Sequence, residues 1–217
     1  MFSNFVKIWL AIIFTSVLIS ETALSNARLS RLPIGWLAAI INLPSEGIFF
    51  ISLFDIEKLL KYGSDKILLN TAALDDPNFI NEAAKEFGSQ CIVVSIDVLK
   101  ENSNHFIMRG YGKEKYNIEI IDYIKIIQEK NAGEIFIQSI NMDGSLKGYD
   151  LSIIDKINDY VKIPLIISSG AGSWQHVKQA LKREVISAAS LTNIFHFTEK
   201  SIINLKNFIK DEIYIRK

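Results

Sequence analysis

The sequence predicts an α/β fold in which parallel strands alternate with helices. Three observations support this: five stretches are almost continuously apolar, each runs into a small polar or acidic residue, and helix-like patterns separate them. Near-continuous apolar runs are typical of parallel strands buried on both faces. Strand–helix alternation at this rhythm indicates right-handed βα units. The predicted strands cover residues 66–70, 91–97, 134–141, 164–169 and 185–190.

Each predicted helix follows from an amphipathic pattern and from residues that begin or end helices. Asp76 and Pro77 predict the start of a helix that ends before Gly88, because aspartate is a favoured N-cap and proline is tolerated in the first turn. A hairpin is predicted between residues 100 and 111. The other helices are expected over 55–61, 118–130, 151–161, from the turn after the fourth strand through 182, and 199–209.

Residues 1–54 are predicted to be an apolar segment distinct from the βα units of residues 55–217. Lys7, the apolar run 8–19 and the segment Ala23-Leu24-Ser25 follow the charged, apolar, small-residue order of a secretory signal. The run is shorter than the about 20 residues that span a membrane. The alternatives are a signal or anchor, or core strands and helices. We expect the second, with a cytoplasmic location, and the sequence alone leaves the signal or anchor open.

The composition indicates a globular protein without a nucleic-acid partner. The 217 residues are 49% apolar, and Lys plus Arg and Asp plus Glu both number 24. No basic field therefore favours nucleic acid. The single cysteine, Cys91, cannot form an internal disulfide, and no Cys/His cluster has zinc spacing. We expect neither a metal nor a cofactor.

Two predicted strand ends have the features of an anion site. Glycines within Ser168–Gly172 let backbone N–H groups approach an anion at the start of a helix. Asn193, after the fifth strand, could add donors; the alternative for the turn is an ordinary strand–helix connection. Asn70 and Thr71, after the first strand, could bind a second phosphate or cap the following helix.

Two carboxylates follow predicted strands. Asp97 is the only acidic residue that ends one of the five runs, and burial there would favour general acid or base chemistry. It could instead cap a helix or pair with Lys100. Asp143 could orient a substrate hydroxyl, or could begin an Asp-Gly turn.

Several motifs, in order and with consistent spacing, resemble the cyclase subunit of imidazole glycerol phosphate synthase from histidine biosynthesis. The resemblance runs from about residue 55 to about residue 209. It rests on Asp65–Leu74, Phe87–Asp97, Ala132–Ile135, Asp143–Gly144, Gly148–Asp150, Ser169–Gly172 and Ile194–Phe197.

The resemblance implies a (β/α)8 TIM barrel that receives ammonia from a glutaminase partner. Ammonia would pass through the barrel and join a bisphosphorylated ribulosyl-formimino aminoimidazole carboxamide ribonucleotide. Cleavage and ring closure would give imidazole glycerol phosphate and aminoimidazole carboxamide ribotide.

The resemblance also implies roles for residues at matching positions. Asp97 matches one of two acid/base aspartates, and Lys66 and Glu134 match charged residues that gate the ammonia entrance. Asn70 and Thr71 match contacts to one phosphate. The other phosphate site is matched by Gly170, Ala171, Gly172 and Asn193, and Asn193 stands in place of a usual serine. The positions that line the rest of the site are matched by Ser139, Asp143, Gly144 and Ser168.

The chain departs from the family pattern in residues 1–54. They contain no counterpart of the first-strand catalytic aspartate or of the loop lysine that follows it. Leu37–Ala39 stands where the family has a glycine triplet, and Gln138 and Asn141 replace a usual threonine and aspartate. We therefore expect degenerate or replaced N-terminal units and impaired activity. The alternatives are a paralogue that delivers ammonia to another acceptor, such as a surface-sugar precursor, or a non-catalytic barrel remnant.

Overall fold

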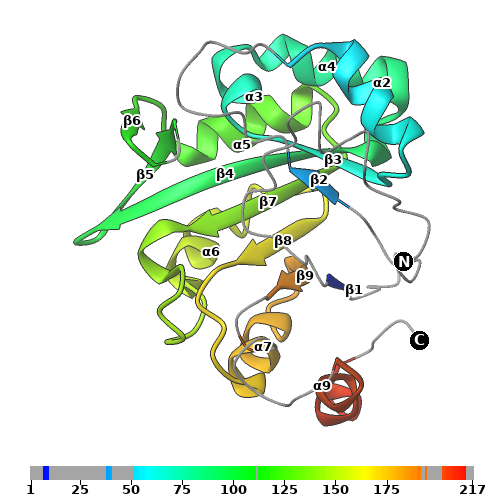
Figure 1. Ribbon diagram of the computed structural model, residues 1–217. Coiled ribbons are helices and arrows are strands. Elements are labelled where there is room, and N and C mark those ends of the chain that lie inside the picture. The colour runs from blue at the N-terminus through cyan, green and yellow to red at the C-terminus, as the bar shows by residue number, and fades with distance from the viewer. Residues whose placement is uncertain are drawn as a thin grey trace.

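The computed structural model describes residues 7–9, 38–40, 51–110, 112–191, 194 and 202–213. Its strands form one sheet whose main path is β1-β9-β8-β7-β4-β3-β2, with every neighbouring pair parallel (Figure 1). The strands of this path are β1 (Lys7–Trp9), β2 (Ala38–Ile40), β3 (Lys66–Leu69), β4 (Ile92–Glu101), β7 (Glu134–Ser139), β8 (Leu165–Ser168) and β9 (Ile186–Ser190).

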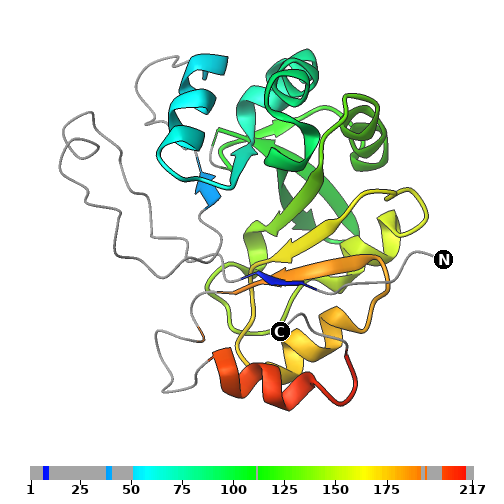
Figure 2. The same ribbon diagram turned by 90° about the vertical axis from the view of Figure 1, so that its right-hand side faces the viewer.

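The order of the parallel strands is that of a barrel. From β2 to β9 each strand lies beside the next parallel strand of the chain, and β1 then pairs with β9. Figure 2 shows β1 in dark blue alongside β9 in orange. In a closed barrel of parallel βα units, the first strand lies beside the last. β1 and β2 both come from residues 1–54, so this segment contributes to the sheet.

The helices confirm most of the predicted boundaries. In Figure 1, α2, α4 and α5 lie above the strands, and α7 and α9 lie below them. The α-helices are α2 (Leu53–Lys61), α3 (Thr71–Asp75), α4 (Pro77–Phe87), α5 (Ile120–Glu129), α6 (Leu151–Ile157), α7 (Trp174–Leu181) and α9 (Ile202–Ile209). Of two 3-10 turns, η2 (Ser89–Cys91) directly precedes β4 and η3 (Ile140–Met142) directly follows β7.

α4 shows how the local sequence sets these boundaries. The Asp76 side chain accepts a hydrogen bond from the Asn78 N–H at 3.0 Å, and Pro77 is the first helical residue. Gly88 ends the helix with φ +88°, a conformation that glycine adopts without strain. The predicted helix over 76–87 is thus confirmed with its capping residues.

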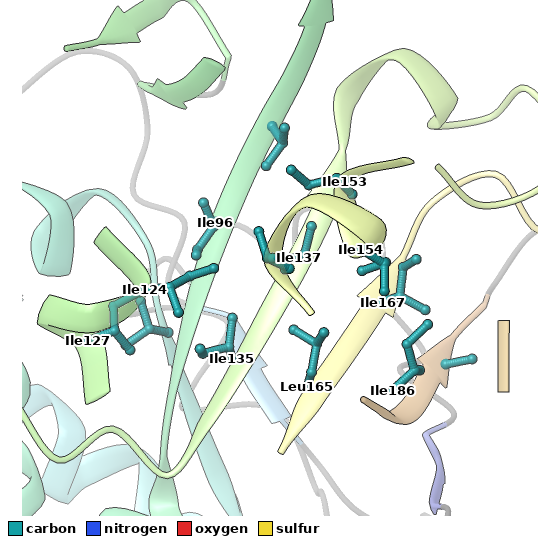
Figure 3. Packing of buried hydrophobic residues seen from close by; sticks show 14 of the residues in the cluster. Ile96, Ile124, Ile127, Ile135, Ile137, Ile153, Ile154, Leu165, Ile167 and Ile186 are labelled. Carbon is teal, nitrogen blue, oxygen red and sulfur yellow. The ribbon is translucent and has the colours of Figure 1, made fainter. Parts of the chain in front are cut away.

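The core lies mainly between the strands and the helices. Figure 3 shows isoleucines of β4 and β7 facing α5 and α6, and all of its labelled side chains are almost fully buried. A smaller apolar cluster occupies the other face of the strands: Leu68, Val93, Phe136, Ile166 and Ala188. The strands are therefore buried on both faces, which explains why their sequences are almost continuously apolar.

Two elements differ from the prediction. β4 continues to Glu101 instead of ending at Asp97, because its last five residues pair antiparallel with β5 (Asn104–Arg109). The end of β4 and β5 thus form the predicted hairpin, and β5 also pairs with a third strand, β6 (Glu114–Tyr116), which was not predicted. α6 ends at Ile157 rather than at residue 161, where Asn158 and Asp159, both weak helix formers, follow.

Among the described residues, no helix has the length and hydrophobicity needed to cross a membrane. Residues 10–19 of the apolar N-terminal run and residues 199–201 of the last predicted helix lie outside the described part of the chain.

Candidate active site

Asp97, Gln138 and Ser168 lie side by side across three neighbouring strands. Asp97 of β4 is in register with Gln138 of β7, and Gln138 is in register with Ser168 of β8. Strand side chains alternate between faces, so all three share the face of Phe136 and Ile166. The three residues lie near the carboxyl ends of their strands, where α/β barrels place their chemistry.

The environment of Asp97 raises the pKa of its carboxyl group. Burial is the largest cause, and the negative charge of Asp143 adds to it, whereas hydrogen bonding with the Asn70 side chain opposes it. A carboxyl group with a raised pKa can hold a proton to higher pH and both donate and accept it near neutrality. The alternative ion pair with Lys100 is absent from the described residues, where Lys100 Nζ contacts Ser152 Oγ at 2.7 Å and Asp150 Oδ1 at 3.7 Å.

Asn70 and Thr71 begin α3 at the end of β3. Asn70 occupies the N-cap position, but its side chain makes no capping hydrogen bond. The Thr71 hydroxyl lies 3.5 Å from Asn70 Oδ1. The capping alternative therefore does not describe the Asn70 side chain, which instead acts on Asp97 and opposes the rise in the pKa of its carboxyl group.

The turn from β8 to α7 packs backbone against backbone on the loop that follows β7. A Cβ on Gly170 would lie 2.1 Å from the Gly148 carbonyl oxygen, and one on Gly172 would lie 2.1 Å from the Leu146 carbonyl oxygen. The Gly148 N–H also donates to the Gly170 carbonyl at 2.7 Å. Only glycine permits this approach, which explains both glycines of the predicted motif.

This turn holds buried backbone donors without protein acceptors. Gly170 and Ala171 are buried, and in the described part of the chain their N–H groups donate to no protein group. Buried N–H groups are nearly always paired, so these two are suited to a ligand or water oxygen at the start of α7. The Gly172 N–H is already used, because it donates to His176 Nδ1 at 3.2 Å. Sequence reasoning assigned His176 no role, and its only signal is its position four residues after Gly172.

The loop from β7 to α6 places Asp143 near Asp97. Asp143 (φ −62°, ψ 128°) and Gly144 (φ +69°) form a type II turn closed by the Ser145 N–H and the Met142 carbonyl at 3.0 Å. Asp143 is therefore the first of the two central residues of an Asp-Gly turn, which agrees with the turn alternative. Its charge nevertheless acts on Asp97.

Asn141 fixes this loop to β4. Its side chain accepts from the Lys100 N–H at 2.6 Å and donates to the Lys100 carbonyl at 3.1 Å. The amide thus continues the backbone pairing of β4 three residues after Asp97. Asparagine supplies both a donor and an acceptor, whereas an ionised aspartate supplies only acceptors.

A polar cluster that sequence reasoning missed supports the same region. His105 Nε2 lies 3.3 Å from Asp150 Oδ2 and 3.2 Å from Ser152 Oγ. Burial lowers the pKa of His105 although Asp150 opposes this, and the pKa of Asp150 is lowered because Ser152 and Lys100 outweigh its burial. The Ser152 hydroxyl donates to Asp150, which caps α6. Because the serine proton is directed at the carboxylate, this cluster is structural and is not a nucleophilic triad.

Lys66 and Glu134 form a buried ion pair at the opposite ends of the strands. Lys66 Nζ lies 2.9 Å from Glu134 Oε1, with side-chain exposures of 8% and 6%, and donates to the Gln90 carbonyl at 2.8 Å. Each residue begins its strand, β3 or β7. The pair therefore lies at the amino ends of the sheet strands, away from Asp97.

The described part of the structure does not bring the predicted site residues Asn193 and Ser139 together with Asp97. Asn193 lies outside the described residues. Ser139 is 3% exposed and its hydroxyl has no partner in the described part, but strand alternation puts it on the face opposite to Gln138. Its role in lining the site stays a prediction. No group of three or more His, Cys, Asp or Glu side chains among the described residues could hold a metal ion.

The strand order, and the polar residues at the carboxyl ends of the strands, define a protein of the α/β-barrel type. Comparison with known families agrees. The family described as "Histidine biosynthesis protein" matches residues 50–201, and the chain belongs to this family, which has the TIM-barrel fold. The predicted fold class is thus confirmed.

Three curated relatives of this chain have the same name, imidazole glycerol phosphate synthase subunit HisF. The chain is 42% identical over 159 residues to the imidazole glycerol phosphate synthase subunit HisF of Exiguobacterium sp., covering 73% of this chain and 62% of the relative. It is 42% identical over 165 residues to that of Dictyoglomus thermophilum (75% and 65%), and 36% identical over 205 residues to that of Lachnoclostridium phytofermentans (92% and 80%). The chain thus spans a little under two thirds of the length of the first two.

Proposed function

We propose that the chain is a cyclase subunit of the imidazole glycerol phosphate synthase type, and therefore a lyase of histidine biosynthesis. Ammonia is joined to the bisphosphorylated ribulosyl-formimino aminoimidazole carboxamide ribonucleotide. Cleavage and ring closure give imidazole glycerol phosphate and aminoimidazole carboxamide ribotide. The names of the relatives and the family membership support this reaction.

The observation that carries the proposal is the position of Asp97. A substrate with a phosphate at each end needs two anion sites with a proton-transfer group between them. In the sheet order β3-β4-β7-β8, Asp97 is on β4, the Asn70 end of β3 is on one side, and the Gly170 end of β8 is on the other. The raised pKa of Asp97 suits a group that both gives and takes a proton.

The phosphate groups have different donors at the two ends. Asn70 and Thr71 supply side-chain donors at β3, and the N–H groups of Gly170 and Ala171 supply backbone donors after β8. From the family pattern alone, Asn193, which follows β9 in the sequence, adds a donor to the second group. Gly172 contributes close backbone approach, because its own N–H bonds His176.

The other roles follow the positions on the strands and loops. Ser168 shares the strand face of Asp97, and the turn of Asp143 and Gly144 borders it. Lys66 and Glu134 form the ammonia entrance at the amino ends of the strands, where a glutaminase subunit docks. We retain Ser139 as a lining residue from the family pattern alone.

The test supplies ammonium directly, so that no glutaminase partner is needed. Purified chain, ammonium chloride and the bisphosphorylated substrate should release aminoimidazole carboxamide ribotide, measured by chromatography. Asp97→Asn should lower turnover by about 100-fold or more, because general acid–base catalysis contributes about 10²–10⁴-fold. Asp122→Asn is the matched control, since Asp122 is exposed on α5 and pairs only with Lys125 among the described residues.

Two outcomes would contradict the proposal. The first is no turnover by the chain when a full-length relative is active in the same mixture. The second is full activity in Asp97→Asn, which would remove Asp97 from the reaction.

A further inference from the structure

Ser169 adopts a backbone conformation that serine rarely takes. It directly follows β8 and has φ +77°, and the next residue, Gly170, has φ +93°. The non-glycine residues with positive φ in the described part of the chain are Asn102, Asn131, Leu146 and Ser169. Asparagine tolerates the left-handed region, whereas other residues with a Cβ are strained there.

No protein contact offsets this strain. Ser169 is 9% exposed, and its hydroxyl makes no hydrogen bond with any described residue. Serines in turns usually bond a nearby backbone group. Asn131, by comparison, has a side-chain hydrogen bond to Asn81 Oδ1 at 3.3 Å. Ser169 is therefore both strained and nine-tenths buried with an unpartnered donor.

The unpartnered hydroxyl belongs to the same turn as the unpartnered N–H groups of Gly170 and Ala171. Three consecutive buried residues thus carry donors that no described protein group accepts, between a strand and the start of α7. Ser168, the residue before them, shares the strand face of Asp97. Strain that is kept without internal compensation is typical of residues that contact a ligand.

We propose that the Ser169 hydroxyl donates a hydrogen bond to the phosphate monoester bound at this turn, beside the Gly170 and Ala171 N–H groups. The proposal rests on the proposed function, because that function places a phosphate here. Glycine at this position would relieve the strain but would remove the donor. Hydrogen bonds to a charged acceptor are about twice as strong as neutral ones, so the donor has a large effect.

Two substitutions separate the hydroxyl from the strain. Ser169→Ala removes the hydroxyl and keeps the Cβ, and Ser169→Gly removes both. Titration with inorganic phosphate by calorimetry should show about tenfold weaker binding in both variants. The thermal unfolding midpoint without phosphate should be higher for Ser169→Gly than for Ser169→Ala, because only glycine relaxes the left-handed backbone. Relative to the wild-type chain, Ser169→Gly would then bind phosphate more weakly and unfold at a higher temperature.

Asn131→Gly is the matched control, since Asn131 also has positive φ (+63°) but follows α5, away from the turn. It should leave phosphate binding unchanged. Equal or tighter phosphate binding by Ser169→Gly, with a wild-type chain that binds phosphate, would overturn the role of Ser169 and leave the proposed function standing. A wild-type chain that binds no phosphate would instead overturn the anion site of the proposed function, and the role of Ser169 with it.

Discussion

The buried ion pair between Lys66 and Glu134 allows a quantitative prediction. At a separation of 2.9 Å and an effective dielectric constant of about 20, the two charges attract each other by about 6 kcal/mol. Removal of both from water opposes most of this gain. Glu134→Gln removes one charge and leaves the Lys66 ammonium buried without its carboxylate. We expect a loss of about 3–5 kcal/mol in the free energy of unfolding.

Urea unfolding followed by tryptophan fluorescence measures this loss. With an m-value of about 2 kcal/mol/M, the midpoint should fall by about 2 M. The double variant Lys66→Met/Glu134→Leu should recover most of the stability, because it buries no unpaired charge. The exposed pair of Lys61 and Glu57 is the matched control, and Glu57→Gln should change the stability by less than about 0.5 kcal/mol.

A loss of less than about 1 kcal/mol in Glu134→Gln would contradict this expectation, because it would mean that water reaches the pair and screens it. A double variant less stable than Glu134→Gln would also contradict it, because the cost would then come from packing and not from the loss of one charge of the pair.

Two further predictions concern the pH dependence of stability. The pKa of Asp97 is raised by burial, so the folded state binds more protons than the unfolded state between the two pKa values, and wild-type stability rises as the pH falls through the folded pKa. Asp97→Asn should therefore be more stable by about 0.5–2 kcal/mol at pH 7, and this gain should vanish near pH 4; a gain equal at both pH values would contradict it. The pKa of His105 is lowered by burial, so wild-type stability should fall as the pH drops below about 6.5, where the unfolded chain takes up the proton first. His105→Gln should show a smaller fall in Tm between pH 7.5 and pH 5.5, and an identical fall would show that other groups cause it.

The sequence predicts the elements that local signals determine. The central strands are recognisable because burial on both faces requires near-continuous apolar residues, and α4 because Asp76, Pro77 and Gly88 mark its ends. β1 and β2 were not predicted as strands, because three residues within a long apolar run carry no period. Only their parallel partners, β9 and β3, identify them.

Contacts between distant residues account for the features that the sequence did not predict. The end of β4 contains Lys100 and Glu101, which are typical of a loop, yet pairing with β5 makes them part of a strand. His105 and Asp150 are 45 residues apart in the chain, and Lys100 and Asn141 are 41 apart. No local pattern relates such pairs, whereas the motif Ser168–Gly172 is local and was predicted as an anion site from its own residues.

The positions of the catalytic candidates depend on these long-range contacts. Asp143 affects the pKa of Asp97 only because the loop that carries it is held in place on two sides. Asn141 bonds the backbone of Lys100 on β4, and Gly148 bonds and closely contacts Gly170 in the turn after β8. The loop therefore links Asp97 to the turn after β8. In the proposed function, a phosphate bound at that turn would also hold Asp143 in place, and substrate binding would then be coupled to the proton affinity of Asp97 through backbone contacts that only glycine permits.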